Sequence, residues 1–248
     1  MYDYKESKKI VEDILDSSTT VIKKDKIPSS DDAFTYDNGI RTWVSALFVD
    51  IVDSSSLFKE ADEITARIMR SFCSEIISIL KDDDNYREIG IRGDCVYAVF
   101  CAQYKSDLVN VFNLAVTINT FMKMLNKLLK NKGFPTIRAG IGLGCDNELV
   151  IKAGKNGSGI NDKIWIGKAL VDAAHLADKA NRNFINPIAM STIFYDNIIE
   201  KLCKENEKYK LWIEGYKTYS YYINPDFYHC NIIQSNFNNW VENNFNEG

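Results

Sequence analysis

The amino-acid sequence predicts an α+β domain built on a ferredoxin-like βαββαβ core. Short runs rich in β-branched and aromatic residues alternate with two long segments whose apolar residues recur at helical spacing. Two of the runs are joined by a Gly-Asp pair, which is typical of a tight hairpin turn. The resulting order of strand, helix, strand, strand, helix and strand predicts an antiparallel sheet with both helices on one face.

The expected strands share an apolar, β-branched composition and are bounded by turn residues. They are Trp43–Val52, Tyr86–Arg92, Cys95–Cys101, Thr136–Gly142 and the short segment Glu148–Ala153.

Two long amphipathic helices are expected between these strands. In Ser54–Asp82, apolar residues recur every three or four positions after three serines that suit a helix cap. Leu108–Leu129 has the same spacing and is followed by a glycine stop signal. Beyond a Gly/Asn-rich loop at Gly154–Asn161, further helices are expected near Lys168–Ala180 and Met190–Lys204.

The chain is expected to divide into three parts. Residues 1–40 form a leader with a short helix near Lys5–Leu15, and residues 41–205 form the main domain. Residues 206–248 form an aromatic-rich extension that packs on the same domain. Eleven aromatic residues lie in Tyr209–Phe245, and because aromatic residues favour strands, we expect strand and core packing there.

Composition excludes several classes of protein. The 30 basic and 34 acidic residues give a net charge of −4 without a basic block, which disfavours a nucleic-acid partner. None of the six cysteines forms a CxxC pair and there are two histidines, which disfavours a zinc site. The longest apolar run, Cys95–Ala102, has eight residues, against the ~18 of a membrane-spanning helix, so no span is expected. The N-terminus lacks a secretory apolar segment, and we expect a bacterial cytoplasmic protein with reduced thiols.

Two aspartates are candidates for chemistry because of their positions. Asp50 ends the first predicted strand and Asp94 lies in the predicted hairpin turn. In a ferredoxin-like sheet, the first strand is the neighbour of the strand that follows this hairpin turn. Both carboxylates are therefore expected at one edge of the sheet, where they could hold hard divalent cations. A polar turn and the start of a helix follow, which suits a phosphate. The alternative is that Asp50 and Asp53 cap the helix and that Asp94 serves only the turn.

Four sequence motifs resemble those of the class III nucleotide cyclases. FVDIVDSSSLF resembles the FxDIxGFTxL metal and phosphate segment, and IRGDCVYAVF resembles the KxxGDxxxAxF hairpin. TIRAGIGLG resembles the RxGIxxG strand, and WIGKALVDAAHLADKA resembles the WGxxVNxAARLxxxA helix. The motifs occur in the family's order over residues 43–181.

This resemblance implies a nucleoside triphosphate cyclase that acts as a head-to-tail homodimer. By the family's pattern, Asp50 and Asp94 would bind two Mg²⁺ or Mn²⁺ ions, and Ile51 would add its backbone carbonyl. The family's phosphate cradle falls on the backbone of Asp53, Ser54, Ser55 and Ser56. The ribose 3′-hydroxyl would attack the α-phosphate in line and expel pyrophosphate.

The family's purine-reading residues are absent. Gly90 stands where adenylate cyclases have Lys and guanylate cyclases have Glu, and Ile164 stands at the second base-reading position. Arg92 lies two residues beyond Gly90 on the same strand face, which Gly90 would leave empty, and its fork suits the edge of a smaller base. Phe48 shares the face of Asp50 and could line the base pocket. The alternatives are that Arg92 is a surface charge and Phe48 a core residue.

The family's transition-state Asn and Arg are also replaced, by Val171 and His175. Lys152, Lys155 or Lys168 could substitute, although each also fits a solvated charge.

These departures most resemble the pyrimidine cyclases of bacterial Pycsar antiphage systems. Such enzymes convert UTP or CTP into the cyclic monophosphate, which a separate effector protein reads. The alternatives are a cyclase-fold module that binds nucleotide without turnover, a ferredoxin-like RNA binder with outward aromatic residues, and a purine cyclase with an unusual base pocket.

Overall fold

A single twisted sheet organises the chain. The computed structural model describes residues 2–28, 30–59, 62–155, 157–219 and 223–245. In these residues the sheet has the order β3-β4-β2-β5-β7-β9-β8, with β1 paired to β2 and β6 paired to β5. The strands are β1 (Thr20–Lys23), β2 (Asn38–Ile51), β3 (Tyr86–Arg92), β4 (Cys95–Cys101), β5 (Ala139–Gly154), β6 (Asn161–Ile166), β7 (Ile188–Ser191), β8 (Ile213–Tyr216) and β9 (Phe227–Cys230).

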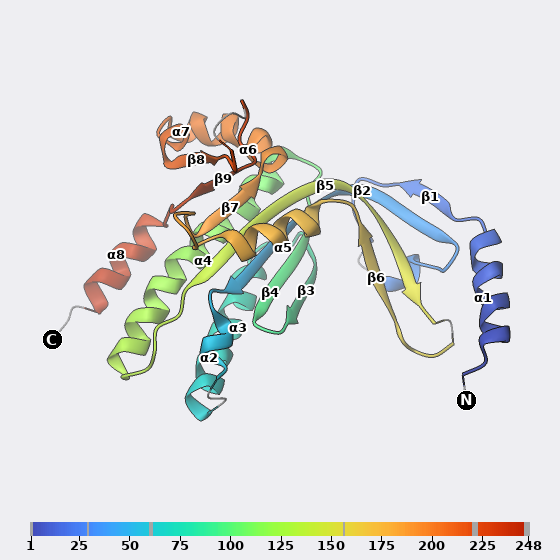
Figure 1. Ribbon diagram of the computed structural model, residues 1–248. Coiled ribbons are helices and arrows are strands. Elements are labelled where there is room, and N and C mark those ends of the chain that lie inside the picture. Colours follow the sequence, from blue (N-terminus) through green and yellow to red (C-terminus); the bar gives the residue numbers. More distant parts are fainter. Residues whose placement is uncertain (1, 29, 60–61, 156, 220–222, 246–248) are drawn as a thin grey trace.

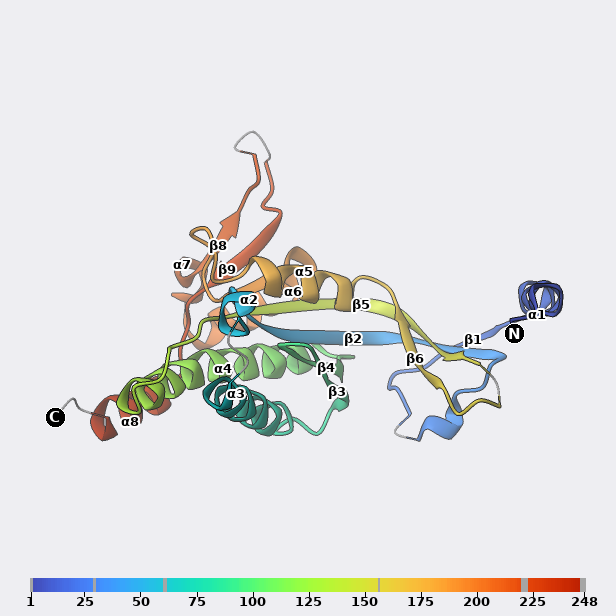
Figure 2. The ribbon, with the colours of Figure 1, turned by 60° about the horizontal axis from the view of Figure 1, so that its bottom comes forward.

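Helices cover both faces of this sheet (Figure 2). They are α1 (Tyr4–Asp16), α2 (Ser54–Leu57), α3 (Glu63–Leu80), α4 (Lys105–Asn131), α5 (Ala169–Lys179), α6 (Thr192–Glu205), α7 (Tyr209–Trp212) and α8 (Ser235–Asn244). The helices α3 and α4 lie on one face of β2 and β5, and α5 lies on the other. The βαββαβ core is therefore confirmed as β2-α3-β3-β4-α4-β5, with its two helices on one face.

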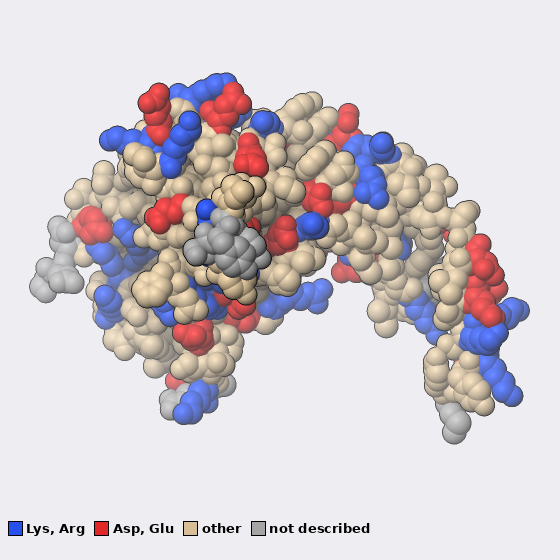
Figure 3. Space-filling view, turned by 45° about the horizontal axis from the view of Figure 1, so that its top comes forward, with Lys and Arg blue, Asp and Glu red and all other residues tan. Residues whose placement is uncertain are grey.

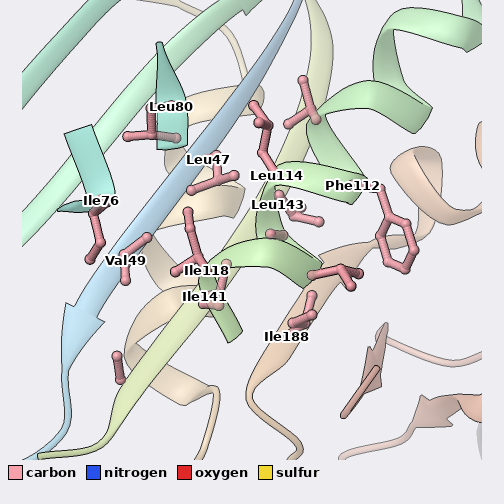
Figure 4. Close-up of a cluster of buried hydrophobic side chains, with 14 of the residues drawn as sticks. Leu47, Val49, Ile76, Leu80, Phe112, Leu114, Ile118, Ile141, Leu143 and Ile188 are labelled. Carbon is pink, nitrogen blue, oxygen red and sulfur yellow. The ribbon is translucent and has the colours of Figure 1, made fainter. Parts of the chain in front are cut away.

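The main core lies between the sheet and the pair α3 and α4. Successive residues of a strand point to opposite faces, and Leu47 and Val49 of β2 point into this core. They meet Ile76 of α3 and Ile118 of α4 there (Figure 4). Val44, Ala46 and Phe48 point instead to the second face, which α5 covers.

The predicted helix Ser54–Asp82 is wrong as a single element. The short α2 ends at Leu57, and α3 begins separately at Glu63. The Asp62 carboxylate accepts a hydrogen bond from the backbone N–H of Thr65 at 2.7 Å. This N-cap starts a second helix, because it satisfies a donor that a continuous helix would satisfy with its own carbonyl.

The two predicted strands Thr136–Gly142 and Glu148–Ala153 are in fact one strand, β5, of 16 residues. The residues between them were left without a prediction. Within this continuous strand, Asp146 and Glu148 use their carboxylates to bind the start of α5. The strands β6 and β7 were not predicted, and α6 begins at Thr192 because the preceding residues form β7.

The segments outside residues 41–205 join the same sheet. In the leader, β1 pairs with β2, and Ile27 and Phe34 are buried. In the C-terminal extension, β9 pairs with β7 and β8 pairs with β9. The helix α8 lies against α4, where Lys127 forms an ion pair with Glu242 at 2.5 Å.

An arm extends from the body of the molecule. The long strands β2 and β5 continue past the helices together with β6 and β1, and α1 lies at the far end (Figure 1). The helix α8 lies at the opposite end of the molecule.

The helix α4 is the one helix among the described residues that is long and apolar enough to cross a membrane. Within its most apolar window, 72% of the residues are buried inside the fold. That burial is what the core helix of a globular domain requires.

A stripe of glycines lets α5 lie directly on β5. A Cβ atom at Gly142 would lie 1.9 Å from the carbonyl oxygen of Ala173, and one at Gly140 would lie 2.2 Å from that of Ala177. No side chain fits in this space, so helix and strand meet backbone to backbone. The contact fixes the height of α5 above the end of β2.

Replacing Gly142 with alanine should therefore destabilise the protein. The added methyl group must push α5 away from the sheet, and overpacking of this kind costs about 1–3 kcal/mol. Urea denaturation measures the loss. Ser158→Thr adds a methyl group in an exposed turn and should leave the midpoint unchanged. An equal midpoint for Gly142→Ala and the wild type would contradict the close contact.

Candidate functional site

The structure brings Asp50, Ile51 and Asp94 together at one edge of the sheet. Val49 of β2 pairs with Val96 of β4, so the end of β2 lies beside the turn that carries Asp94. Burial raises the pKa of Asp50 above its ordinary value, and the negative charge of Asp94 raises it further. The two carboxylates are therefore close enough to interact, as the sequence predicted.

These oxygen donors fit a hard divalent cation. The set holds two carboxylates and the Ile51 carbonyl, and Mg²⁺ and Mn²⁺ prefer oxygen ligands. Nearby Cys95 does not compete as a thiolate, because burial and then the charge of Asp50 raise its pKa to about 12. Among the described residues no three His, Cys, Asp or Glu side chains gather in a metal cluster, so a cation here also needs substrate or water oxygens.

Sequence reasoning missed Arg182, which lies in the loop after α5. Its Nη2 donates hydrogen bonds to Asp50 Oδ2 at 3.0 Å and to the Ile51 carbonyl at 3.3 Å. Its Nη1 donates to the carbonyls of Ala177 at 3.1 Å and Ala180 at 3.2 Å. No motif marks this arginine, because its position depends on how closely α5 approaches the sheet.

The predicted phosphate segment follows directly after β2. Asp53 adopts left-handed backbone angles, with φ of 58°, and turns the chain into the single-turn helix α2. Asp53 occupies the N-cap position of α2, but its side chain makes no capping hydrogen bond, and Asp50 lies within β2. The alternative that both side chains cap the helix is therefore wrong. Instead, Asp53 Oδ2 lies 3.2 Å from Nη2 of Arg138. Ser54 is half-buried, and Ser55 and Ser56 are exposed.

Arg138 is a second arginine that sequence reasoning did not assign. It lies in the TIRAGIGLG motif, just before β5, and its side chain is 57% exposed. Its Nη1 donates to the carbonyl of Asn181 at 2.9 Å. Arg138 and Arg182 thus place two guanidinium groups beside the edge of the sheet that carries Asp50 and Asp94, which we call the carboxylate edge.

The Gly90 face is not empty, which corrects the prediction. Gly90 pairs with Tyr97 across the hairpin, and a Cβ atom at Gly90 would lie 2.5 Å from the Tyr97 ring. The ring therefore occupies the space next to position 90. It stacks on Phe48 with ring centroids 5.1 Å apart and an interplanar angle of 17°.

The Tyr97 ring is fixed by its hydroxyl group. This hydroxyl donates to Glu88 Oε1 at 2.7 Å, and the Trp165 indole donates to Glu88 Oε2 at 3.0 Å. Burial, followed by the Glu88 hydrogen bond, raises the pKa of Tyr97 to about 12, so the hydroxyl keeps its proton at neutral pH. The exposed Arg92 also interacts with this hydroxyl.

Other predicted positions lie on outer surfaces. Ile164 of β6 is 47% exposed, and its neighbour Trp165 reaches Glu88 from the opposite face of the strand. Within one chain, the Ile164 side chain therefore points away from the side of β6 that reaches Glu88 and Tyr97. Val171 is 51% exposed on α5, and His175 is exposed on the same helix.

The candidate lysines are dispersed. Lys155 and Lys168 are exposed, whereas Lys152 lies 5.7 Å from the centre of the Tyr36 ring in the arm.

A separate groove lies between α3 and α4, on the face of the sheet opposite α5. Its lining includes Arg67, Phe121 and Lys132, and none of the predicted site residues.

On the face that Figure 3 shows, Lys and Arg alternate with Asp and Glu instead of forming a continuous basic patch. This pattern, with Phe48 and Tyr97 packed on each other, disfavours the RNA-binding alternative.

The start of α5 rests on a buried carboxylate. Glu148 is 0% exposed, and its Oε1 accepts a hydrogen bond from the Ala169 backbone N–H at 2.7 Å. Its Oε2 is buried and has no hydrogen-bond partner. Burial raises the pKa of Glu148 above its ordinary value of 4.5.

A Glu148→Gln variant should show a flatter dependence of stability on pH. Because the folded state binds this proton more tightly, the wild type loses stability as the pH rises from about 4.5 through the raised pKa. Glutamine keeps an oxygen for Ala169 and cannot ionise. Melting temperatures measured from pH 4.5 to neutral pH should therefore diverge in favour of the variant. Parallel pH profiles would rule out a raised pKa at Glu148.

Comparisons with known proteins identify relatives of this chain and proteins of the same fold. No family model matches the chain. It is 43% identical to a uridylate cyclase of Treponema porcinum over 243 residues, which cover 97% of this chain and 81% of that protein. It is 30% identical to a uridylate cyclase of Gulbenkiania mobilis over 253 residues, with coverage of 98% and 97%. The structure resembles the adenylyl cyclase CyaB of P. aeruginosa with a TM-score of 0.60 and 18% identity, covering 77% of this chain and 95% of that one.

Proposed function

This chain belongs to the family of uridylate cyclases, and we propose that it converts UTP into 3′,5′-cyclic UMP and pyrophosphate. The observation that carries the proposal is the 43% identity over 97% of the chain. The proposal is also supported by the oxygen donors that would bind the metal ions at one edge of the sheet, from Asp50, Ile51 and Asp94. In the reaction, the 3′-oxygen forms a bond to the α-phosphorus. The bond from that phosphorus to the pyrophosphate oxygen breaks, and the 3′-hydroxyl proton is released.

The carboxylate edge would hold two Mg²⁺ or Mn²⁺ ions through Asp50, Asp94 and the Ile51 carbonyl. When bound, such ions lower the pKa of a coordinated hydroxyl and neutralise phosphate charge. The backbone N–H groups of Asp53, Ser54 and Ser55 lie beyond the end of β2 and would bind the triphosphate, whereas that of Ser56 donates to the Asp53 carbonyl at 2.9 Å. Arg138, exposed beside this segment, adds a positive charge for the same phosphates.

The Phe48–Tyr97 pair would select a small base. The Tyr97 ring fills the space next to Gly90, so less room is left for a base than an open glycine face would give. The Phe48 ring offers an apolar surface, and Arg92 offers donors for the uracil carbonyl oxygens. Because uracil and cytosine differ at one edge, the choice of UTP over CTP rests on the relatives' shared name.

A homodimer would complete the site. Ile164, Val171 and His175 lie on exposed surfaces, which are available to a second copy of the chain. The resemblance to antiphage pyrimidine cyclases supports a role for the product as a signal that a separate effector protein reads.

Replacing either carboxylate of the ligand set should abolish turnover. Asp50→Asn and Asp94→Asn remove one negative ligand each, and we expect cyclic UMP formation to fall by about a thousandfold or more. Mass-resolved assays with UTP and Mn²⁺ measure the loss, and circular dichroism checks the fold. Glu75→Gln, an exposed change on α3, serves as the matched control. Full activity in either aspartate variant would refute this metal site.

Arg92→Gln should weaken recognition of the base without weakening metal binding. Loss of a charged hydrogen bond to uracil is expected to lower kcat/KM for UTP by about 10- to 100-fold. Mn²⁺ affinity should stay within twofold of the wild type, because the exposed Arg92 side chain interacts with the Tyr97 hydroxyl and is not among the groups that shift the pKa of Asp50. Unchanged kcat/KM in the variant would mean that Arg92 is only a surface charge.

The alternative of a binding module without turnover predicts bound nucleotide and no product in the wild type.

A further inference from the structure

We propose that Arg182 is an internal cation that competes with the divalent metal for Asp50 and the Ile51 carbonyl. The inference rests on the proposed function, because it takes these two groups as metal ligands. It assigns Arg182 the role of a positioning residue that sets how tightly the enzyme binds metal without nucleotide.

One nitrogen of the guanidinium carries the contact. The Nη2 atom lies 3.0 Å from Asp50 Oδ2 and 3.3 Å from the Ile51 carbonyl oxygen. A cation held by both oxygens would draw on the same lone pairs that accept these two hydrogen bonds. The guanidinium and the metal therefore cannot both hold these oxygens at full strength.

The other half of the guanidinium is anchored independently. Its Nη1 binds the carbonyls of Ala177 and Ala180 at the end of α5, where a positive charge also interacts favourably with the helix dipole. Both side chains of the Arg182–Asp50 pair are largely shielded, at 21% and 23% exposed. Displacement of Nη2 therefore breaks a partly buried, charge-assisted contact and leaves the anchor intact.

The loop around Arg182 is built to hold this position. Asn181, Asn183 and Phe184 all have positive φ, at 59°, 45° and 69°. Such angles are uncommon for residues other than glycine, and here they form a tight turn. Backbone hydrogen bonds close it, from Ile185 N–H to the Arg182 carbonyl at 2.8 Å and from Asn181 N–H to the Asn186 carbonyl at 3.2 Å. Asn181 also donates a side-chain hydrogen bond to the Ala139 carbonyl at 3.1 Å. The loop thus fixes the guanidinium against the end of β2.

If the Arg182 guanidinium moves away from Asp50, another acceptor lies nearby. Asp178 Oδ1 lies 4.0 Å from Nη2, and its side chain is 81% exposed. A small rotation about the anchored half therefore moves the charge from Asp50 toward Asp178. The triphosphate of a substrate would supply further acceptors, so metal and nucleotide are expected to bind cooperatively.

Metal binding without nucleotide tests the proposal. Mn²⁺ is titrated into the full-length protein, and free Mn²⁺ is followed by electron paramagnetic resonance. Because Arg182→Gln removes the competing charge, its Mn²⁺ affinity should rise about tenfold. The Mn²⁺-induced increase in Tm should also be larger than in the wild type. An unchanged or weaker Mn²⁺ affinity in this variant would overturn the proposal.

Two control variants separate the possible explanations. Arg138→Gln removes a nearby charge that pairs with Asp53, and it should change Mn²⁺ affinity less than about twofold, because exposed charges are screened. An equal effect of both arginine variants would indicate a general field effect and contradict direct competition. Asp50→Asn should lose Mn²⁺ binding. If it does not, the proposed metal site fails, whereas normal Mn²⁺ affinity in Arg182→Gln alone defeats only the Arg182 inference.

Arg182→Lys keeps the test decisive if the glutamine variant fails to fold. Lysine preserves the charge, but one ammonium group cannot bind the α5 carbonyls and the Asp50 pair together. Its Mn²⁺ affinity should exceed that of the wild type by a smaller factor. Wild-type affinity in a folded Arg182→Lys protein would count against the proposal.

Discussion

The close contact between α5 and the glycine stripe of β5 is the constraint on which the site depends. Because Gly140 and Gly142 have no side chains, the helix backbone meets the strand directly. That contact brings the last carbonyls of α5 beside the end of β2, where they anchor Arg182. At its other end, the same helix is bound by Asp146 and Glu148 of β5. The position of α5 therefore links the sheet, the carboxylate edge and the arm.

The two faces of β2 have separate roles. Alternation sends Leu47, Val49 and Ile51 into the main core, while Phe48 and Asp50 point to the face that α5 covers. A one-residue slip in register would exchange these sets and bury the carboxylate among apolar side chains. The core that stabilises the fold thus also fixes which side chains can meet a nucleotide.

The sequence predicted the parts of the molecule that depend on local pattern. The βαββαβ order and the meeting of Asp50 with Asp94 follow from hydrophobic periodicity and strand adjacency. The break before α3 was missed because the Asp62 cap lies within an otherwise periodic segment. The continuous β5 was missed because Asp146 and Asn147 interrupt the apolar pattern between the two predicted strands. Tyr97 and Arg182 needed three-dimensional information, since one fills space left by a glycine on another strand and the other arrives through the packing of α5.

The product profile of the wild-type protein tests the proposed uridylate cyclase activity most directly. The purified chain is incubated with all four ribonucleoside triphosphates and Mn²⁺, and the products are resolved by mass. Cyclic UMP is expected as the main product, because the Tyr97 ring occupies the space next to Gly90 and the relatives are uridylate cyclases. Cyclic AMP or cyclic GMP as the main product, or bound nucleotide without any cyclic product, would contradict the proposed activity.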